Sequence, residues 1–171
     1  HVIKLKKIRL LKIDDNILVQ EFIKKNKSDF LYFEKLGWNK TNVENQLKKN
    51  NSLSLGYFNN EELVGLLLGE TLNFERNLIL EIHVLIVIKD FRRKKIATKI
   101  LKYIEKENDF CNISTLLIEV AEDNSIATRF YRKNSFVYYN FRPNYYRYDN
   151  KLINASCFKK IINNEWEINL Y

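Results

Sequence analysis

Hydrophobic and polar residues alternate in short blocks along this chain, and several blocks repeat every second residue, as in a half-buried strand. Val2–Ile13 alternates apolar and basic residues in this way. Leu53–Phe58 and Leu63–Leu72 flank Asn59-Asn60-Glu61, residues that tolerate turn conformations, and so predict a β-hairpin. Leu78–Ile88 is apolar on both faces, which is typical of a central strand.

Other segments carry apolar residues at helical spacing, and polar residues that can cap a helix stand at their starts. The four predicted helices are a stripe from Ile17 to Ile23 after Asp14-Asp15, Trp38–Lys49, Ala97–Glu107 and Ser125–Lys133. Three later segments predict strands, namely Thr115–Val120, Phe136–Phe141 and Cys157–Asn169. The alternation of both periods indicates a mixed α/β (α+β) fold built on one sheet. A length of 171 residues suits one core, so we expect a single domain over residues 1–171.

Composition narrows the class of protein. Apolar residues make up 46% and aromatic residues 13% of the chain, too many for a disordered protein. The longest apolar run, Leu78–Ile88, is interrupted by Glu81 and His83, and it falls short of the roughly 18 residues that predict a membrane span. We therefore expect no membrane association. Cys111 and Cys157 are too few for a disulfide framework and lack metal-ligand spacing, so reduced cysteines and no metal site are expected.

Charge adds a preference for an anionic partner. The 29 basic and 21 acidic residues give a net charge of +8. Lysine is abundant throughout the chain, which also fits a general compositional bias. The chain begins at His1 rather than Met, so a preceding targeting segment stays open. We expect a soluble, intracellular protein, in a compartment that the sequence does not specify.

The segment Leu117–Phe136 is the most informative part of the chain. An apolar strand stops at acidic and amide residues, and a helical segment follows with Asn124 or Asp123 in a capping position. Tyr131 lies seven residues after Asn124, two helical turns on, so it can return to the end of the strand. A carboxylate such as Glu119 and a phenol brought together there are a candidate acid/base pair.

A second site is predicted at Lys89–Thr98, between the central strand and the next helix. Arg92 to Lys95 are four consecutive cations that lead into the helix N-terminus. Backbone N–H groups and the helix dipole favour an anion there, and the basic side chains add to that field. The segment is a candidate pyrophosphate site, although a basic run taken alone is more often a solvated surface.

The order LxEVxxxNxxAxxFYxxxxF, from Leu117 to Phe136, resembles the GNAT superfamily of acetyl-CoA-dependent N-acetyltransferases. The basic segment is similar to its acyl-CoA loop, [Q/R]xxGx[G/A], with Arg92 first and Ala97 last, but Lys95 stands where the family usually has Gly. A left-handed conformation at Lys95 would cost about 1–2 kcal/mol. The resemblance implies a GNAT fold: one mixed, mostly antiparallel sheet of about seven strands, four flanking helices and a splayed strand pair that binds acyl-CoA.

The resemblance also implies roles for individual residues. Acetyl-CoA would be the co-substrate, without a metal. Glu119, twelve residues before Tyr131, and Glu81, eleven before Arg92, match two alternative positions of the catalytic base, and Tyr131 matches the general acid. The implied cofactor-binding residues are Leu85, Ile86, Val87, Arg92, Arg93, Lys94, Lys95, Ile96, Ala97, Thr98, Asn124 and Tyr131.

Arg142–Tyr146 resembles the (R/K)xNYY element of protein N-terminal acetyltransferases, both of the RimI type, which acetylates a ribosomal protein, and of the eukaryotic NatE type. Gly37–Lys40 is similar to their aromatic peptide-binding loop. The implied substrate-binding residues are Leu36, Trp38, Tyr145 and Tyr146. The implied function is acetylation of a peptide or protein N-terminus, with the ribosome or a ribosomal protein as a partner, by a monomer or weak dimer.

Two other functions stay open. One is a GNAT enzyme for a small amine such as a polyamine or amino sugar, since Val120–Asn124 also resembles polyamine acetyltransferases and Glu122 would be their acidic residue. The other is a non-catalytic, basic binding module that keeps the fold without the cofactor, which Lys95 makes conceivable. Calorimetry with acetyl-CoA distinguishes the module from both enzymes, because the module would show no measurable binding.

Overall fold

The computed structural model describes residues 7–30, 38–75, 77–110, 112–148 and 150–162. The chain divides into two compact units and passes from one to the other three times. The first unit comprises His1–Glu70 and His83–Tyr103, and the second comprises Thr71–Ile82 and Ile104–Tyr171. Strand β4 belongs to both units, so the expectation of a single domain stays a prediction. None of the helices in the described ranges is both long and apolar enough to cross a membrane.

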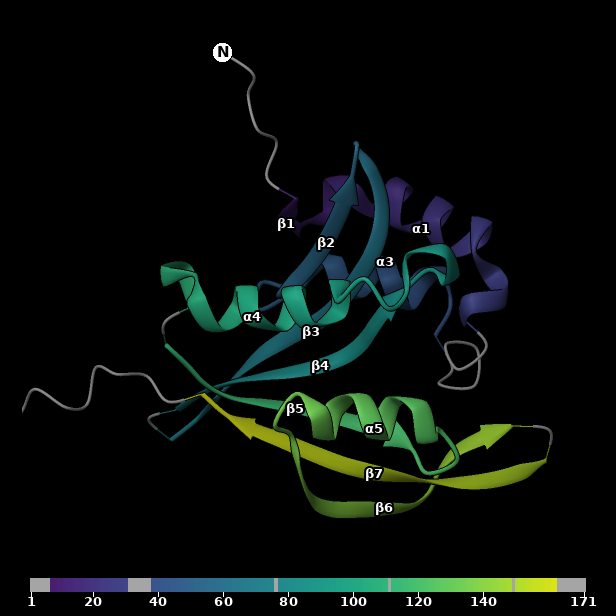
Figure 1. The fold of residues 1–171 in the computed structure, drawn as a ribbon, viewed down its shortest axis with the longest axis vertical. Helices are drawn as coiled ribbons and strands as arrows, with labels where there is room; N and C mark the ends of the chain where they lie inside the picture. Colours follow the sequence, from purple (N-terminus) through teal and green to yellow (C-terminus); the bar gives the residue numbers. More distant parts are fainter. Residues whose placement is uncertain (1–6, 31–37, 76, 111, 149, 163–171) are drawn as a thin grey trace, which may run out of the picture. The chain divides into compact units, whose positions relative to one another are not determined.

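The first unit contains most of the N-terminal elements (Figure 1). These are β1 Ile8–Leu11, α1 Asn16–Lys25, α3 Lys40–Lys48, β2 Ser54–Asn59, most of β3 Glu62–Phe74, the end of β4 Asn77–Val87 and most of α4 Ile96–Lys106. Short 3-10 helices at Ile13–Asp15, Lys27–Phe30 and Lys89–Phe91 connect them. The predicted hairpin is confirmed: β2 and β3 meet at Asn59↔Glu62, and Asn60 and Glu61 have positive φ values of 47° and 69°.

The first strand is shorter than the alternation predicted, because the chain turns at Lys12. The Asp15 carboxylate accepts a hydrogen bond from the Lys12 backbone N–H at 2.9 Å and pairs with the Arg9 guanidinium at 2.8 Å. These bonds stabilise a 3-10 turn at Ile13–Asp15 in place of further strand. Val2 to Lys6 lie outside the described residues. The capping prediction for α3 is confirmed, since Asn39 Oδ1 accepts from the Asn42 N–H at 3.0 Å.

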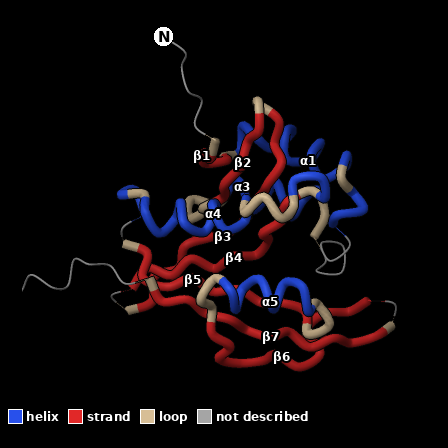
Figure 2. Tube along the Cα trace, viewed as in Figure 1, coloured by secondary structure: helices blue, strands red, loops and turns tan. Residues whose placement is uncertain are grey.

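The second unit contains the start of β4, then β5 Ile113–Ala121, α5 Ser125–Lys133, β6 Val137–Tyr148 and β7 Lys151–Ile161, with a 3-10 helix at Asn108–Phe110. Figure 2 shows β7 between β5 and β6. Both ladders of β7 are antiparallel, and the β6–β7 register shifts twice, at Tyr138/Asn140 and Arg142/Tyr146. Strand β6 is twice as long as the predicted Phe136–Phe141, because Arg142–Tyr146 continues it. Strand β7 begins six residues before Cys157, and residues 163–169 lie outside the description.

Hydrogen bonds join seven strands in the order β1-β2-β3-β4-β5-β7-β6, and the described residues form four α-helices. β4 and β5 run parallel, whereas β1–β2, β2–β3, β5–β7 and β6–β7 are antiparallel. This is the predicted mixed, mostly antiparallel sheet. The β4–β5 register pairs run from Leu78↔Ile113 to Ile82↔Ile118, although β4 continues to Val87 and β5 to Ala121.

Apolar side chains on alternate strand residues and on one face of α4 form the core. Ile100, Leu101 and Ile104, the predicted stripe of α4, are at most 1% exposed. Gly65 on β3 allows α4 to approach closely. A Cβ atom there would lie 3.0 Å from Ile96 Cγ2 and 3.3 Å from Ile100 Cδ1. The packing therefore fixes where the N-terminus of α4 lies on the first unit.

Candidate functional site

The basic turn, Arg92 to Lys95, ends directly at the N-terminus of α4. Arg93 and Lys95 both have φ values of 60°, in the left-handed region that L-residues disfavour. The α-helix begins there, since the Lys95 carbonyl accepts a hydrogen bond from the Lys99 N–H at 2.9 Å. Lys95 therefore adopts the left-handed conformation that a glycine would take without strain, at a cost of about 1–2 kcal/mol.

The four cations of the basic turn are exposed, while Ile96 is buried and Ala97 and Thr98 are half-buried. Arg92 Nε donates to the Val87 carbonyl at 2.9 Å, so this side chain also ties the turn to the end of β4. Lys94 Nζ lies 4.6 Å from the centroid of the Phe91 ring. The first N–H groups of a helix have no intrahelical acceptor, so the turn brings positive charge next to backbone donors that the helix itself does not pair. That combination fits a phosphate-bearing ligand.

The predicted cofactor strand, Leu85–Val87, forms the end of β4 and is half-buried. These residues lie in the first unit, beyond the last β4–β5 register pair. The next residue, Ile88, donates its N–H to the Val64 carbonyl at 3.1 Å. The strand thus leads directly into the 3-10 helix Lys89–Phe91 and the basic turn.

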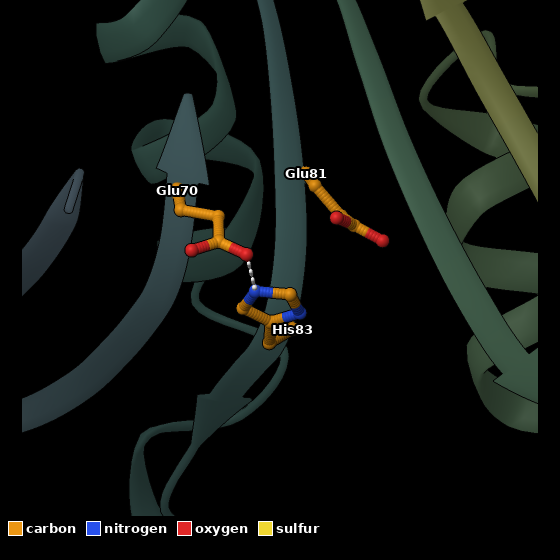
Figure 3. Close-up of side chains that lie close together, drawn as sticks. All are labelled: Glu70, Glu81 and His83. Atoms are coloured by element: carbon orange, nitrogen blue, oxygen red, sulfur yellow. Dashed lines mark hydrogen bonds and ion pairs between the residues drawn. The ribbon is translucent and has the colours of Figure 1, made fainter. Parts of the chain in front are cut away.

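Trp38, predicted to bind substrate, is half-buried in the first unit and packs against His83, with the ring centroids 5.8 Å apart. His83 Nε2 lies 3.3 Å from Glu70 Oε1, and Glu70 Oε2 accepts from Lys49 Nζ at 2.6 Å. Figure 3 shows the Glu70–His83 bond, with Glu81 two residues before His83 on β4. Burial opposes a low pKa at Glu70, but the Lys49 and His83 interactions outweigh it and lower that pKa. Leu36 lies outside the described residues.

In the second unit, Glu119 is the centre of a polar cluster. Its Oε1 accepts from Arg142 Nε at 2.7 Å, and its side chain is only 17% exposed. Tyr145 donates a further hydrogen bond to the Glu119 carboxylate. Cys157, buried on β7, is the register partner of Glu119. The Glu119 cluster, as we define it, consists of Glu119, Tyr139, Arg142, Tyr145, Tyr146 and Cys157.

Burial, together with the charge of Glu119, keeps the phenols and the thiol of this cluster protonated. Burial and the Glu119 interactions raise the pKa of Tyr145 to about 12. Burial, followed by the Glu119 charge, also raises the pKa values of Tyr146 and of the Cys157 thiol. Burial alone would lower the pKa of the Arg142 guanidinium, but the charge of the same carboxylate and smaller effects of Tyr145 and Cys157 together outweigh it, and that pKa is raised. At neutral pH the cluster therefore contains neutral phenols and a thiol around one ion pair.

Glu81, the second candidate base, lies in the same unit. It is the register partner of Leu117 on β5, two residues before Glu119, so both carboxylates lie on one face of the parallel pair. Its charge contributes to the raised pKa values of Tyr139 and Tyr145. The structure thus brings both predicted carboxylates to the same tyrosines and does not select one of them as the base.

Tyr131 lies on α5 and is 4% exposed. The predicted cap of this helix is confirmed, because Asn124 Oδ1 accepts from the Ala127 N–H at 3.1 Å. The Tyr131 ring meets Phe130 and Phe136 edge-on, with centroids 5.1 and 5.2 Å away. Burial, with a smaller effect from Tyr146, raises the Tyr131 pKa well above its usual range. The phenol is therefore a protonated donor at any physiological pH.

The pairing of Glu119 with Tyr131 is less direct than the sequence predicted. The described side-chain interactions of Tyr131 are with Phe130, Phe136 and Tyr146. After burial, the Glu119 charge is the next cause of the raised pKa of Tyr146. Tyr146, which is 5% exposed and whose ring lies 4.9 Å from that of Tyr145, is thus the residue common to the predicted base and acid.

Sequence reasoning missed three contributors. It gave no role to Arg142 as the ion-pair partner of Glu119, to Cys157 as its register neighbour, or to Asn154, which bonds to both Asn144 and Glu122. The Pro143-Asn144 dipeptide inside a strand signals an irregularity. Glu122, which the small-amine alternative singled out, lines an open groove of about 460 Å³ beneath α5.

Comparison with known proteins agrees with this architecture. The pattern of the acetyltransferase (GNAT) family matches residues 17–136. No curated protein matches the chain in sequence. The ribosomal-protein-S18-alanine N-acetyltransferase from Escherichia coli superposes with a TM-score of 0.74 at 17% identity, covering 96% of this chain and 97% of that one. Arabidopsis thaliana NAA60 in complex with acetyl-CoA gives 0.73 at 14%, covering 91% and 98%. PaiA N-acetyltransferase from Thermoplasma acidophilum with coenzyme A gives 0.67 at 21%, covering 90% and 97%.

Proposed function

The chain belongs to the acetyltransferase (GNAT) family and is thus an acyltransferase, and on that premise we propose that it acetylates the α-amine at the N-terminus of a peptide or protein. The observation that carries this proposal is the position of Tyr145. This side chain is 46% exposed, and it hydrogen-bonds the half-buried carboxylate of Glu119 while packing on Tyr146. An exposed aromatic beside a fixed carboxylate suits an extended substrate, since it can cover a peptide chain whose amine approaches the carboxylate.

Acetyl-CoA is the co-substrate, and it supplies an acetyl thioester that an amine can attack. The basic turn fits its phosphates, because left-handed backbone at Arg93 and Lys95 precedes the N-terminus of α4 and the cations are exposed. Lys95 replaces the small residue of the family loop but adds a charge. The end of β4, at Leu85–Val87, is our candidate for the contact with the pantetheine arm. Asn124 and Tyr131 complete the proposed cofactor residues.

The substrate amine must be neutral when it attacks the thioester carbon. An N-terminal amine has a pKa of about 7.7–8.0, against about 10.4 for lysine, so a modest base suffices. Glu119 or Glu81, directly or through a water molecule, accepts the proton that leaves the amine as the C–N bond forms. When the C–S bond breaks, the Tyr131 phenol donates its proton to the departing thiolate. Burial raises the pKa of Tyr131, which keeps the phenol protonated at neutral pH but also makes it a weaker acid.

Arg142 limits what Glu119 can do alone. One oxygen of the carboxylate is engaged with the Arg142 guanidinium, and Tyr145 hydrogen-bonds the same group. These two bonds occupy part of the roughly four acceptor positions of the Glu119 carboxylate, so an amine or a water molecule can use only the remaining ones. Glu81 has neither residue as a described hydrogen-bond partner. Both carboxylates stay candidates, and their glutamine variants separate them.

The experiment offers the protein and acetyl-CoA a panel of amines and measures coenzyme A release. The panel contains peptides with free N-termini, including one that copies the start of a ribosomal protein, the same peptides with a blocked N-terminus, and a polyamine and an amino sugar. We expect release with the free N-termini alone. Turnover with the polyamine or sugar would establish the small-amine alternative. An absence of acetyl-CoA binding in calorimetry would establish the non-catalytic module.

The sequence also favours a partner for this activity. The net charge of +8 suits an anionic surface such as the ribosome, and the RimI-type resemblance points in the same direction. We propose a ribosomal protein as one substrate, acted on by a monomer or weak dimer. Co-sedimentation with ribosomes at low and high salt, followed by size-exclusion chromatography of the free protein, tests both points.

A further inference from the structure

Asn154 on β7 uses both ends of its side chain and its backbone to connect an irregularity in β6 with the turn after β5. Its Oδ1 accepts from the Asn144 N–H at 3.0 Å, and its Nδ2 donates to Glu122 Oε2 at 2.9 Å. Its backbone carbonyl accepts from the Glu122 N–H at 2.9 Å. The planar amide of an asparagine side chain accepts a hydrogen bond through its oxygen and donates one through its nitrogen.

The Asn144 end of this link supports the irregularity in β6. Arg142 is the register partner of Ala155, and the next described pair is Tyr146 with Ile153. Three residues of β6 therefore stand opposite one residue of β7, Asn154. Asn144, in the middle of the three, has a φ of 54°. The bulge displaces Tyr145 from regular strand geometry, and the Asn154 side chain pairs the N–H that the bulge removes from the ladder.

The Glu122 end supports the turn between β5 and α5. Glu122 follows Ala121, the last residue of β5, and precedes the Asn124 cap of the helix that carries Tyr131. Asn154 thus joins the β6 bulge, beside which Arg142 and Tyr145 contact Glu119, to the turn that leads into the helix of the proposed acid.

We propose that Asn154 is a positioning residue of the peptide site: it fixes the β6 bulge so that Tyr145 and Arg142 both reach Glu119. The inference rests on the proposed function, since it assigns the bulge to the substrate. Asn154 itself touches neither the amine nor the thioester. It acts through two hydrogen bonds, and these define the variants that test it.

Four variants separate the two bonds. Asn154→Ala removes both. Asn154→Asp keeps an acceptor for the Asn144 N–H but places a second carboxylate against Glu122. Glu122→Gln keeps an acceptor for Asn154 Nδ2 and serves as the matched control. The double variant Asn154→Asp/Glu122→Gln restores the bond with donor and acceptor exchanged, because the new glutamine amide can donate to the new carboxylate.

We expect Asn154→Ala and Asn154→Asp to raise the peptide KM by about threefold to tenfold, as the loss of one or two exposed hydrogen bonds would. Acetyl-CoA affinity should stay at the parent value, Glu122→Gln should resemble the parent, and the double variant should recover most of the KM. A peptide KM that does not change in Asn154→Ala, or a double variant as impaired as Asn154→Asp, would overturn the proposal.

A second readout does not need activity. With ¹³C-labelled tyrosine rings, the Tyr145 signal can be assigned by its absence in Tyr145→Phe and followed against pH. Displacement of Tyr145 from Glu119 should lower its pKa from about 12, because the hydrogen bond and the charge of Glu119 both raise it. An unchanged Tyr145 titration in both Asn154 variants contradicts the positioning role. If the parent acetylates no peptide while the Tyr145 titration still shifts, the proposed function fails and the link stands.

Discussion

The basic turn and the Glu119 cluster prepare for their ligands in different ways. The basic turn is contiguous in sequence, its four cations are exposed, and its charge is reinforced by a helix terminus. The Glu119 cluster draws residues from β5, β6 and β7, and it places one ion pair among neutral phenols. Tyr146 and Cys157 are buried and Glu119 is half-buried, whereas Tyr139, Arg142 and Tyr145 are exposed. The turn can attract an anion from a distance, whereas the cluster can orient a substrate only at contact. Added salt should therefore weaken ligand binding at the basic turn. In the cluster, the removal of a single hydrogen-bonding atom should change substrate binding.

The largest expected effect comes from the Tyr131 hydroxyl. Tyr131→Phe keeps the packing with Phe130 and Phe136, so the fold and both KM values should change little. A positioned general acid contributes about 10²–10⁴-fold, and kcat should fall by that factor. Steady-state kinetics with a peptide and acetyl-CoA measure it. A kcat within about threefold of the parent would remove Tyr131 from the proton transfer, since that is below the low end of such effects.

The next effect distinguishes the two carboxylates. Glu119→Gln and Glu81→Gln are isosteric, and we expect the variant of the true base to lose about 10- to 100-fold in kcat at neutral pH, near the low end for acid/base groups. Its defect should shrink towards pH 9, because more of the peptide amine is then already neutral. The other variant should show a smaller loss that does not depend on pH. Equal, pH-independent losses in both would mean that neither carboxylate accepts the proton.

A smaller, gradual effect should appear in alkali. Tyr131, Tyr145 and Tyr146 have pKa values raised above the ordinary value of 10. A raised folded-state pKa stabilises the fold below the unfolded pKa, and that stability is lost as pH rises towards the folded value. The free energy of unfolding should therefore decline from about pH 10 upwards, by at most about 1.4 kcal/mol per pH unit for a completely buried tyrosine. Urea titrations between pH 8 and 11 measure the slope, and Tyr131→Phe should reduce it; an unchanged slope contradicts this.

The smallest effect concerns the backbone of the basic turn. Lys95→Gly and Lys95→Ala both remove the charge, but only glycine relieves the left-handed conformation. Lys95→Gly should be more stable than Lys95→Ala by about 1 kcal/mol. Thermal or urea unfolding of the two variants measures the difference. Equal stabilities would mean that the turn holds no strain at Lys95.

Local signals predicted much of this fold. The helix α5 spans Ser125–Lys133 as predicted, because Asn124 supplies a cap and the strand before it ends in acidic residues. The left-handed requirement at Lys95 also followed from the loop that it resembles. Both features depend on neighbours within a few residues, so the sequence contains them directly.

The interactions of the Glu119 cluster depend on strand register instead. Glu119 stands opposite Cys157 in the regular β5–β7 ladder. Arg142, which pairs with Glu119, follows one register shift between β6 and β7, and Tyr145 lies in the second. A shift by one residue would turn these side chains to the other face. The prediction for the first strand was wrong at its end. Alternation predicted a strand as far as Ile13, but the hydrogen bonds of Asp15 turn the chain there.

The contrast between the two regions is tested most directly by measuring how one variant of each region binds both substrates. Arg93→Ala/Lys94→Ala changes the basic turn without removing the Arg92 bond to Val87, and Tyr145→Phe changes the cluster by one hydroxyl. Calorimetry gives the acetyl-CoA affinity and initial rates give the peptide KM. We predict that the turn variant weakens acetyl-CoA by roughly tenfold, more at low salt, and leaves the peptide KM unchanged. Tyr145→Phe should do the reverse. Variants that each weaken both substrates equally would contradict the division of roles.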